Sequence, residues 1–299
     1  MSDAVFGVIV TGNIVIDTIV RPVTRITWGA THWVDEIAEQ LGGNGASTAS
    51  ALAILGTPAK LVGWIGQDAL GDRAVSALVQ AGVSLEWVTR GSLPTASTIA
   101  LVAPDGLRSL LHRPGVSLEG CDTPIEFTDR LIEGVRHFHL ANPFSMNGLR
   151  RHAPESLRNA KQAGLTTSLD TGWDAKGEWR KVLDPCLSHV DVLFVNETEA
   201  EILERDGERL AAPVVVKKLG GQGCEVNGEK IAALAVDAVD TTGAGDCFAG
   251  GFLSAWLRGS SLGDAGRFAN AVGALSVSRL GSITGLLSYE ETLAWMRRK

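Results

Sequence analysis

Residues 240–246 of the chain read Asp-Thr-Thr-Gly-Ala-Gly-Asp, and the segment that follows them has an apolar pattern with helical spacing. Large apolar side chains recur on one face of that segment, at Phe248, Phe252, Leu253, Trp256 and Leu257, ahead of a stop at Gly259. Gly243 and Gly245 let the backbone approach a phosphate closely, and the free N–H groups of a helix start favour negative charge. The stretch therefore predicts an anion-binding loop at the start of a helix.

Asp246 stands in the first turn of this expected helix. An aspartate there is commonly a cap, but a cap does not require glycine on both sides of Ala244, whereas a loop around a phosphate does. Phosphoryl transfer needs positioning, charge neutralisation and a group that accepts the hydroxyl proton, and Asp246 can accept it. The chain has no Gly-x-x-x-x-Gly-Lys-Ser/Thr stretch, and Phe248 replaces the third glycine of a dinucleotide fingerprint. A P-loop is thus set aside and a dehydrogenase is disfavoured.

Short β-branched runs alternate with amphipathic or small-residue stretches along the chain, which is typical of a mostly parallel α/β sheet. The expected strands are apolar on both faces, as buried parallel strands are, and cover residues 5–10, 60–65, 135–140, 165–169, 192–195 and 213–217. We predict one helix that starts at Asp72 and ends at Gly82. Ser288 and Glu291 have capping-box spacing and predict a last helix.

Two segments interrupt this alternation, residues 11–36 and residues 97–113. In the second, Asp105-Gly106 separates two β-branched or apolar runs and predicts a hairpin. We interpret both segments as a small β-lid inserted in a single domain that spans residues 1–299, because no Pro-, Gly- or Ser-rich linker divides the chain.

Composition restricts the partners and the location. The 299 residues are 45% hydrophobic, and 27 basic against 34 acidic residues give a net charge of -7 without a basic cluster, which disfavours nucleic acid. No apolar run approaches the roughly 20 residues that span a membrane, and the N-terminus lacks the features of a secretory signal, so we expect a cytoplasmic protein. The four cysteines have no Cys-x-x-Cys spacing and predict neither a zinc site nor disulfides.

Taken together, the motifs resemble those of the ribokinase-like, or PfkB, carbohydrate kinase family. Residues 240–246 match its C-terminal signature Asp-Thr-x-Gly-Ala-Gly-Asp, and residues 42–46, Gly-Gly-Asn-Gly-Ala, are similar to its N-terminal one. Asn196 to Glu199 looks like its Asn-x-x-Glu, and residues 218–223 look like its nucleotide-side turn. The resemblance implies a three-layer α/β/α sandwich with a mostly parallel central sheet and a small β-sheet lid.

The resemblance also implies an ATP-dependent kinase. Asp246 would be the base, and the amides of Gly243, Ala244 and Gly245 would hold the transferred phosphoryl group. The nucleotide would contact Asn196, Lys218, Gly220, Gly221, Gly223, Asn270 and Ala274, although small residues on a helix also serve packing. Glu199 would organise Mg²⁺ through water, whereas spacing alone favours a helix-start Asn196 and an exposed Glu199. A monovalent cation such as K⁺ would lie near Asp240, Thr242 and Gly281.

On the acceptor side, the resemblance assigns a sugar-like substrate to Asp17, Asn13, Gly42, Gly43, Ser47 and His112. Two positions depart from the family pattern. Ser47 replaces an asparagine, and Ala141-Asn142-Pro143 stands where ribose-phosphorylating relatives have a glutamate, so ribose itself is in doubt. Arg108 and Arg113 could bind a substrate phosphate or solvate an edge strand.

Other residues allow more than one interpretation. His137 and His139 would share one face of a strand, where structural histidines are favoured over metal ligands. Trp28 and Trp33 could cover the substrate, join two lids in a homodimer or pack locally. Two rival functions stay open as well, a nucleoside kinase of the same fold and a non-catalytic sugar-binding protein.

Overall fold

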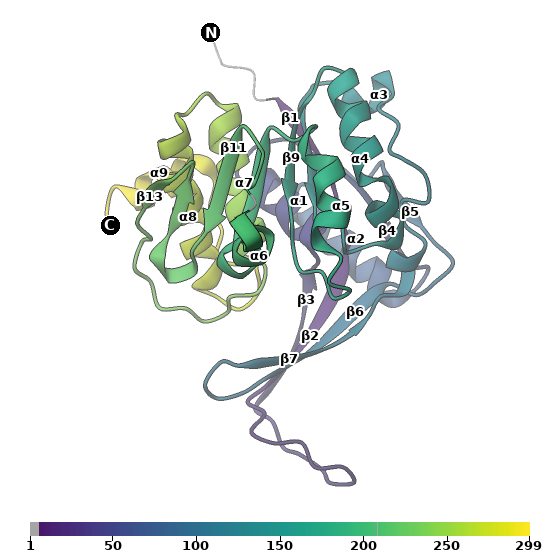
Figure 1. Ribbon diagram of the computed structural model, residues 1–299. Coiled ribbons are helices and arrows are strands. Elements are labelled where there is room, and N and C mark those ends of the chain that lie inside the picture. Colours follow the sequence, from purple (N-terminus) through teal and green to yellow (C-terminus); the bar gives the residue numbers. More distant parts are fainter. Residues whose placement is uncertain (1–5, 208) are drawn as a thin grey trace.

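The computed structural model describes residues 6–207 and 209–299; Val5, at the start of one expected strand, lies outside them. Within that part of the chain, nine strands form the central sheet in the order β13-β12-β11-β10-β9-β8-β1-β4-β5 (Figure 1). Its parallel strands are β1 (Gly7–Thr11), β4 (Ala59–Ile65), β5 (Val88–Arg90), β8 (Val135–Ala141), β9 (Thr166–Asp170), β10 (Val192–Asn196) and β11 (Val214–Lys218). The last two strands at one side of the sheet, β12 (Cys224–Val226) and β13 (Glu229–Ile231), pair in antiparallel fashion. The predicted mostly parallel sheet is confirmed.

Helices cover both faces of this sheet. One face carries α1 (Asn44–Ile54), α2 (Ala69–Ala81), α7 (Ala244–Leu257) and α8 (Leu262–Val277), with α9 (Tyr289–Met296) packed on α8. The other carries α3 (Asp129–Ile132), α4 (Asn147–Gln162), α5 (Trp179–Leu187) and α6 (Glu197–Leu203). Successive strand residues face opposite layers, so Val8 packs in the first core and Ile9 in the second. The α/β/α sandwich is therefore confirmed.

Small residues bring α1 and α7 close together. A Cβ atom added to Gly250 of α7 would lie only 3.0 Å from the Cβ atom of Ala51 on α1. On the other side of α7, a Cβ atom on Gly251 would lie 2.9 Å from Val272 of α8. The close approach of α1 to α7 places their N-terminal residues, Asn44 and Ala244, at the same end of the sandwich.

A second, four-stranded sheet projects from the body at the end where the parallel strands stop (Figure 1). It consists of β2 (Val15–Arg21), β3 (Glu36–Gly42), β6 (Ala96–Val102) and β7 (Arg108–Arg113), in the order β3-β2-β6-β7. We call this sheet the lid. β6 and β7 form the predicted antiparallel hairpin, while β2 and β6 pair in parallel. The lid differs from the expected segments at two ends, because β3 continues from Glu36 to Gly42 and Thr11 belongs to β1 of the central sheet.

One helix start differs from the prediction. α2 is capped by Asp68, whose side chain accepts from the N–H of Gly71, and Asp72 instead lies in the first turn. Asp68 has the extended backbone that a capping residue needs, and so takes that place four residues earlier than expected. The predicted end of α2 is confirmed, since Gly82 is left-handed with φ of 87°. The predicted start of the last helix is confirmed too, since Ser288 forms the capping box with Glu291.

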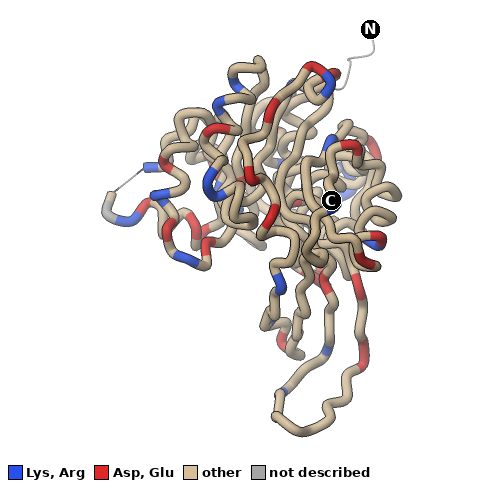
Figure 2. Tube along the Cα trace, turned by 90° about the vertical axis from the view of Figure 1, so that its right-hand side faces the viewer, with Lys and Arg blue, Asp and Glu red and all other residues tan. Residues whose placement is uncertain are grey.

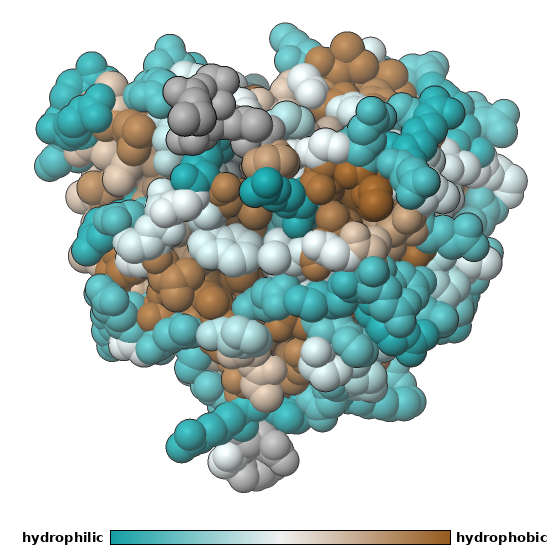
Figure 3. Space-filling model, turned by 90° about the horizontal axis from the view of Figure 1, so that it is seen from above, coloured by the Kyte–Doolittle hydropathy of each residue, from teal (hydrophilic) through white to brown (hydrophobic). Residues whose placement is uncertain are grey.

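The surfaces of the two ends differ. Seen from the end where the parallel strands begin, hydrophilic side chains surround smaller apolar areas (Figure 3). At the opposite end, the long connection from β2 to β3 is mostly uncharged, with Arg25 and Asp35 its charged residues (Figure 2). Among the described helices, none is both long and apolar enough to cross a membrane.

Candidate active site

The glycine-rich loop leads into α7, as the sequence predicts. Gly243 is the N-cap residue, with φ of 70°, and α7 begins at Ala244. A side chain at Gly243 would be strained by this φ and would meet Ser282, since its Cβ would lie 2.6 Å from that of Ser282. The first N–H groups of α7 therefore point out of a loop that no side chain at residue 243 obstructs, which suits an anion.

Asp246 lies in the first turn of α7, inside a cluster of charged side chains. Burial raises the pKa of Asp246 to about 7, with the Asp170 carboxylate adding to that rise. A hydrogen bond of 2.9 Å from Nδ2 of Asn44, and the charge of Lys218, act in the opposite direction. The carboxyl group is therefore balanced between its two protonation states near neutral pH.

Lys218 supplies the positive charge of this cluster. Its Nζ lies 2.6 Å from Oδ2 of Asp170, and a Cβ atom added to Gly245 would lie 3.2 Å from the same Nζ. Burial acts to lower the pKa of Lys218, but the Asp170 and Glu199 carboxylates outweigh it and raise that pKa. An ammonium group thus stands directly beside the amides of the anion loop.

A cavity of about 460 Å³ opens on the other side of the loop. All seven residues expected to contact a nucleotide line it, namely Asn196, Lys218, Gly220, Gly221, Gly223, Asn270 and Ala274, and Ala244 and Gly245 join them. Asn270 supports the wall of the cavity, because its Nδ2 donates to the carbonyls of Ile231 and Ala232, at 3.1 Å each. The cavity is mostly apolar with the anion loop and an ammonium group at one end, which suits a nucleotide.

Asn196 and Glu199 form a capping box at the start of α6. The side chain of Asn196 accepts from the N–H of Glu199, and Oε2 of Glu199 accepts from the N–H of Asn196 and from Thr171 Oγ1. The helix-start interpretation of Asn196 is correct, but Glu199 is buried rather than exposed. Its carboxylate lies close enough to Asp246 and Lys218 to shift their pKa values.

On the acceptor side, three lid strands place side chains in one row. Asp17 on β2 is opposite Thr98 on β6, which is opposite His112 on β7, and Thr98 Oγ1 lies 3.1 Å from His112 Nδ1. Asp17 also rests against the bare Cα of Gly42. Burial raises the pKa of Asp17, and the Asp240 carboxylate adds to this. The row lies on the face of the lid turned toward the loop.

Three further expected substrate residues support the loops around them. Oδ1 of Asn13 accepts from the N–H of Asn44 at 2.9 Å, and Gly43, with φ of 93°, precedes α1. Ser47 is buried, and its hydroxyl lies 3.4 Å from that of Ser282, beside Gly243. The structure therefore places Ser47 under the anion loop.

Asp240, at the start of the loop, binds an arginine from the lid. Nη2 of Arg108 lies 2.9 Å from Oδ1 of Asp240, and Nη1 of Arg108 contacts the Thr242 hydroxyl. Oδ2 of Asp240 accepts from the N–H of Gly281 at 3.0 Å. Although burial favours the neutral acid, the bonds from Thr242, Gly281 and Arg108 lower the pKa of Asp240. The residues expected near a monovalent cation thus do come together, with a guanidinium group among them.

His137, His139 and the two exposed tryptophans of the lid end do not line the cavity. His137 and His139 are buried and bond to Ser168 Oγ at 2.7 Å each, as structural histidines would. The described residues contain no group of three His, Cys, Asp or Glu side chains that could hold a metal ion. Trp28 and Trp33 are 96% and 92% exposed at the tip of the lid, so local packing does not explain them.

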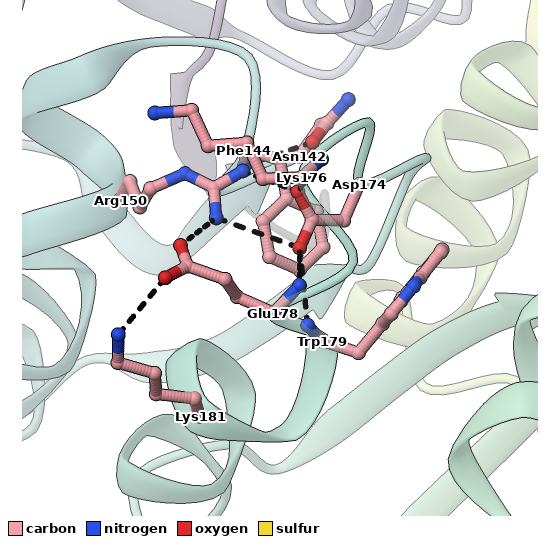
Figure 4. A network of polar contacts seen from close by, with 8 residues as sticks. All are labelled: Asn142, Phe144, Arg150, Asp174, Lys176, Glu178, Trp179 and Lys181. Atoms are coloured by element: carbon pink, nitrogen blue, oxygen red, sulfur yellow. Dashed lines mark hydrogen bonds and ion pairs between the residues drawn. The ribbon is translucent and has the colours of Figure 1, made fainter.

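Sequence reasoning missed three residues of the site, Asn44, Asp170 and Asn142. Asp170 ends β9 at the carboxyl edge of the parallel sheet, a position where ligands bind in such folds and one that could have identified it. Asn142 follows β8 at the same edge, and the sequence identifies it only as part of a departure from the family pattern. Figure 4 shows it beside Phe144 and the Arg150–Asp174 ion pair, which together join α4 to the loop after β9.

Comparisons with known proteins show the family and the fold of the chain. Residues 7–288 match the family described as pfkB family carbohydrate kinase. The chain is 34% identical to an ATP-dependent ribose-1-phosphate kinase of Halopiger xanaduensis, over 86% of this chain and 91% of that protein. A structure of Arabidopsis thaliana ribokinase complexed with ribose and ATP superposes with a TM-score of 0.82 at 25% identity, covering 98% of this chain and 99% of that one. A Methanocaldococcus jannaschii nucleoside kinase shares the fold, with a TM-score of 0.83 at 19% identity over 98% of each chain.

Proposed function

The chain belongs to the pfkB family of carbohydrate kinases, and on this basis we propose that it transfers the γ-phosphoryl group of ATP to a hydroxyl of a sugar or sugar-like molecule. The observation that carries the proposal is the position of Asp246. Its partly buried carboxylate lies in the first turn of α7, where Ala244 and Gly245 line the nucleotide-sized cavity, and the loop before this helix is bonded to Arg108 of the lid.

In the proposed reaction, Asp246 accepts the proton of the acceptor hydroxyl as its oxygen bonds to the γ-phosphorus. The bond from that phosphorus to the bridging oxygen breaks, and the electron pair leaves with ADP. A pKa of about 7 suits this role, because a base is most effective when its pKa lies near the working pH.

The phosphoryl group needs its charge stabilised during transfer. The N–H groups of residues 243–245 and the ammonium of Lys218 would supply this stabilisation. A magnesium ion bound with ATP would neutralise phosphate charge, taking most ligands from phosphates and water. The carboxylates of Glu199 and Asp170, which both shift the pKa values of Lys218 and Asp246, would hold its waters.

The pairing of Asp240 with Arg108 bears on the proposed K⁺ site. Asp240 already accepts from the lid arginine, from Thr242 and from Gly281, so a cation held there would have to share the carboxylate with a guanidinium group. We therefore propose that Arg108 provides this positive charge itself, and that the lid is tied to the anion loop through it.

We also propose a homodimer formed through the lid. Ile37, Ile99 and Leu111 are 66%, 44% and 60% exposed, and Ile99 is directly opposite Leu111 in the register of β6 and β7. Trp28 and Trp33, in the connection between β2 and β3, are further exposed apolar side chains of the lid end. Light scattering would show a mass near twice 31.5 kDa for the natural chain and near 31.5 kDa for an Ile99→Lys variant.

The acceptor is tested by coupling ADP release to a panel that includes ribose, ribose 1-phosphate, fructose and nucleosides. The proposal expects turnover with a sugar or sugar phosphate, and loss of about 100- to 10,000-fold in kcat for Asp246→Asn without loss of folding. Turnover with nucleosides alone would make the protein a nucleoside kinase instead. Ligand binding without ADP release from any acceptor would favour the sugar-binding alternative. Near-normal turnover by Asp246→Asn would refute the base assignment.

The expected cytoplasmic location remains part of this proposal. The four cysteines are free and buried, as in proteins of a reducing compartment where ATP is also available.

A further inference from the structure

The orientation of the Asp246 carboxylate is set by a side-chain amide from another helix. Nδ2 of Asn44, the first residue of α1, donates to Oδ1 of Asp246 at 2.9 Å. A carboxamide has an oxygen at one end and an NH₂ group at the other, and the two ends have nearly the same shape. If Asn44 turned over, its oxygen would face the carboxylate and repel it. Something must therefore hold Asn44 in the donating orientation.

Asn142, on the loop after β8, provides that control. Its Nδ2 donates to Oδ1 of Asn44 at 3.1 Å, while its own Oδ1 accepts from the backbone N–H of Phe144 at 3.0 Å. A backbone N–H can only donate, so it fixes which end of the Asn142 amide is the oxygen. The NH₂ group of Asn142 then faces Asn44, whose oxygen must face Asn142 and whose NH₂ group must face Asp246.

Asn142 is itself firmly held. Its N–H donates to the Asp170 carbonyl at 2.9 Å, and its own carbonyl accepts from the hydroxyl of Ser145 at 2.7 Å. Its φ of 61° lies in the left-handed region, which asparagine tolerates better than most residues. The carboxamide packs against the bare Cα of Gly172, where a Cβ atom would collide with it.

The loop that carries Asn142 is anchored on its far side too. The guanidinium of Arg150 lies 4.9 Å from the ring centre of Phe144 and is ion-paired with buried Asp174 (Figure 4). Asp174 also accepts from the N–H groups of Glu178 and Trp179. The Phe144 N–H that orients Asn142 is thus part of a fixed structure rather than of a free loop.

From this geometry we propose that Asn142 is a positioning residue for the proposed phosphoryl transfer, acting through Asn44 to keep a hydrogen-bond donor on the Asp246 carboxylate. The inference rests on the proposed role of Asp246 as the base. With Oδ1 bonded to Asn44, Oδ2 is the oxygen left to accept the proton of the substrate hydroxyl. The relay runs from the Phe144 N–H through two carboxamides to the base.

The Asn44 hydrogen bond and the neighbouring carboxylates shift the pKa of Asp246 in opposite directions. Asp170 on β9 and Glu199 on α6 disfavour its ionised form, whereas Lys218 on β11 and the Asn44 bond favour it. Loss of the Asn44 donor should therefore raise the pKa of Asp246, since a hydrogen bond to the charged form stabilises that form.

The decisive experiment is a double-mutant cycle with Asn44→Ala, Asn142→Gly and both together. Glycine at residue 142 tolerates the left-handed backbone, so the variant removes the side chain without adding strain. Selective ¹³C labelling of aspartate carboxyls, assigned with Asp246→Asn, reports the pKa of Asp246 without any need for the acceptor. A rate profile against pH follows the same group wherever turnover is measurable.

We expect Asn44→Ala to raise the pKa of Asp246 by about one unit, so that the rate at pH 6 falls about tenfold and recovers near pH 9. Asn142→Gly should raise the pKa of Asp246 by part of this amount, and the double variant should raise it no further than Asn44→Ala alone. An unshifted Asn142→Gly, or two shifts that add in the double variant, would overturn the relay.

A matched control is Asn227→Gly. Asn227 also has a positive φ of 48° and bonds through both ends of its carboxamide, but it lies in the turn between β12 and β13. It should leave the pKa of Asp246 unchanged, and a shift as large as that of Asn142→Gly would count against the relay. The two proposals can fail independently. Full activity in Asp246→Asn would refute the role of Asp246 as the base, whereas titration of the Asp246 carboxyl group in the asparagine variants would still test the relay.

Discussion

The guanidinium group of Arg108 on the lid strand β7 lies 2.9 Å from the carboxylate of Asp240, the first residue of the glycine-rich loop. These two residues are 132 positions apart in the chain. The Asp240 side chain is 3% exposed, so its charge depends on partners that the fold supplies. Arg108 thereby connects the position of the lid to that of the loop that would bind phosphate.

We predict that Arg108→Ala makes the protein respond to K⁺. Without the guanidinium, buried Asp240 lacks one positive partner, and a monovalent cation could bind between Asp240 and Thr242 in its place. ADP release should fall in tetramethylammonium chloride and be partly restored by KCl at equal ionic strength, whereas the natural chain should respond little. Arg21→Ala is the control, because Arg21 pairs with Glu36 within the lid. Equal K⁺ responses in all three proteins would contradict the prediction.

Lys218→Met should weaken ATP use and move the acid limb of the rate profile upward. The substitution leaves the Asp170, Glu199 and Asp246 carboxylates without their cation, which raises the pKa of Asp246 and removes a phosphate partner. We expect the KM for ATP to rise about tenfold or more, consistent with the loss of a charged hydrogen bond worth about 1.5–3 kcal/mol. Steady-state kinetics from pH 6 to pH 9 measure both effects.

The neighbouring residue offers a matched control for that experiment. Lys217 is also on β11 but pairs with Glu204 at 2.8 Å, away from the cavity. A partly exposed pair of this kind contributes about 1 kcal/mol or less. Lys217→Met should therefore keep the KM for ATP and the pH profile of the natural chain, and a loss equal to that of Lys218→Met would show that the strand, not the charge, matters.

Gly245→Ala should reduce phosphoryl transfer while the protein stays folded. The added methyl group would lie 3.2 Å from Nζ of Lys218, beside the amides that face the cavity. We expect a loss of about 100-fold or more in kcat, the scale seen when one donor to a developing charge is removed. Gly263→Ala, near the start of α8, meets its neighbours at 3.6 Å or beyond and should leave kcat unchanged. Activity close to normal in Gly245→Ala would argue against an anion loop at residues 243–245.

Acid should destabilise the fold through its buried histidines. Burial lowers the pKa of His137 to about 3, with Lys161 adding to the effect, whereas an unfolded histidine titrates near 6.5. The unfolded state therefore binds more protons below pH 6.5, and the free energy of unfolding falls as pH falls from about 6.5 toward 3. Between pH 7 and pH 5.5 we expect a loss of about 1 kcal/mol for each such histidine.

Urea denaturation at these two pH values measures the effect. His137→Gln keeps a polar side chain between Thr166 and Ser168 but cannot titrate, so its unfolding free energy should depend less on pH. His32→Gln, at an exposed lid residue, should retain the full dependence. A dependence that is the same in all three proteins would assign it to other groups.

The sequence by itself determined the parallel sheet and the glycine-rich loop at the start of a helix. These two features follow from local rules, since apolar runs predict buried strands and glycine permits the backbone of the loop. The residues expected at the nucleotide came instead from the family resemblance. The local rules also limited the prediction. They placed a helix start at Asp72 instead of Asp68, because both aspartates precede the same apolar pattern and only the backbone conformation selects the cap.

The tertiary structure alone decided what surrounds the reacting groups. Asn44 and Asp246 are 202 positions apart and meet because Gly250 and Ala51 let α7 and α1 pack closely. One edge of the sheet brings together Asp170 and Lys218, which end β9 and β11, and Asn142, which directly follows β8. The pKa of Asp246 is a sum over these neighbours and over burial, so it depends on distances that no local pattern of residues encodes.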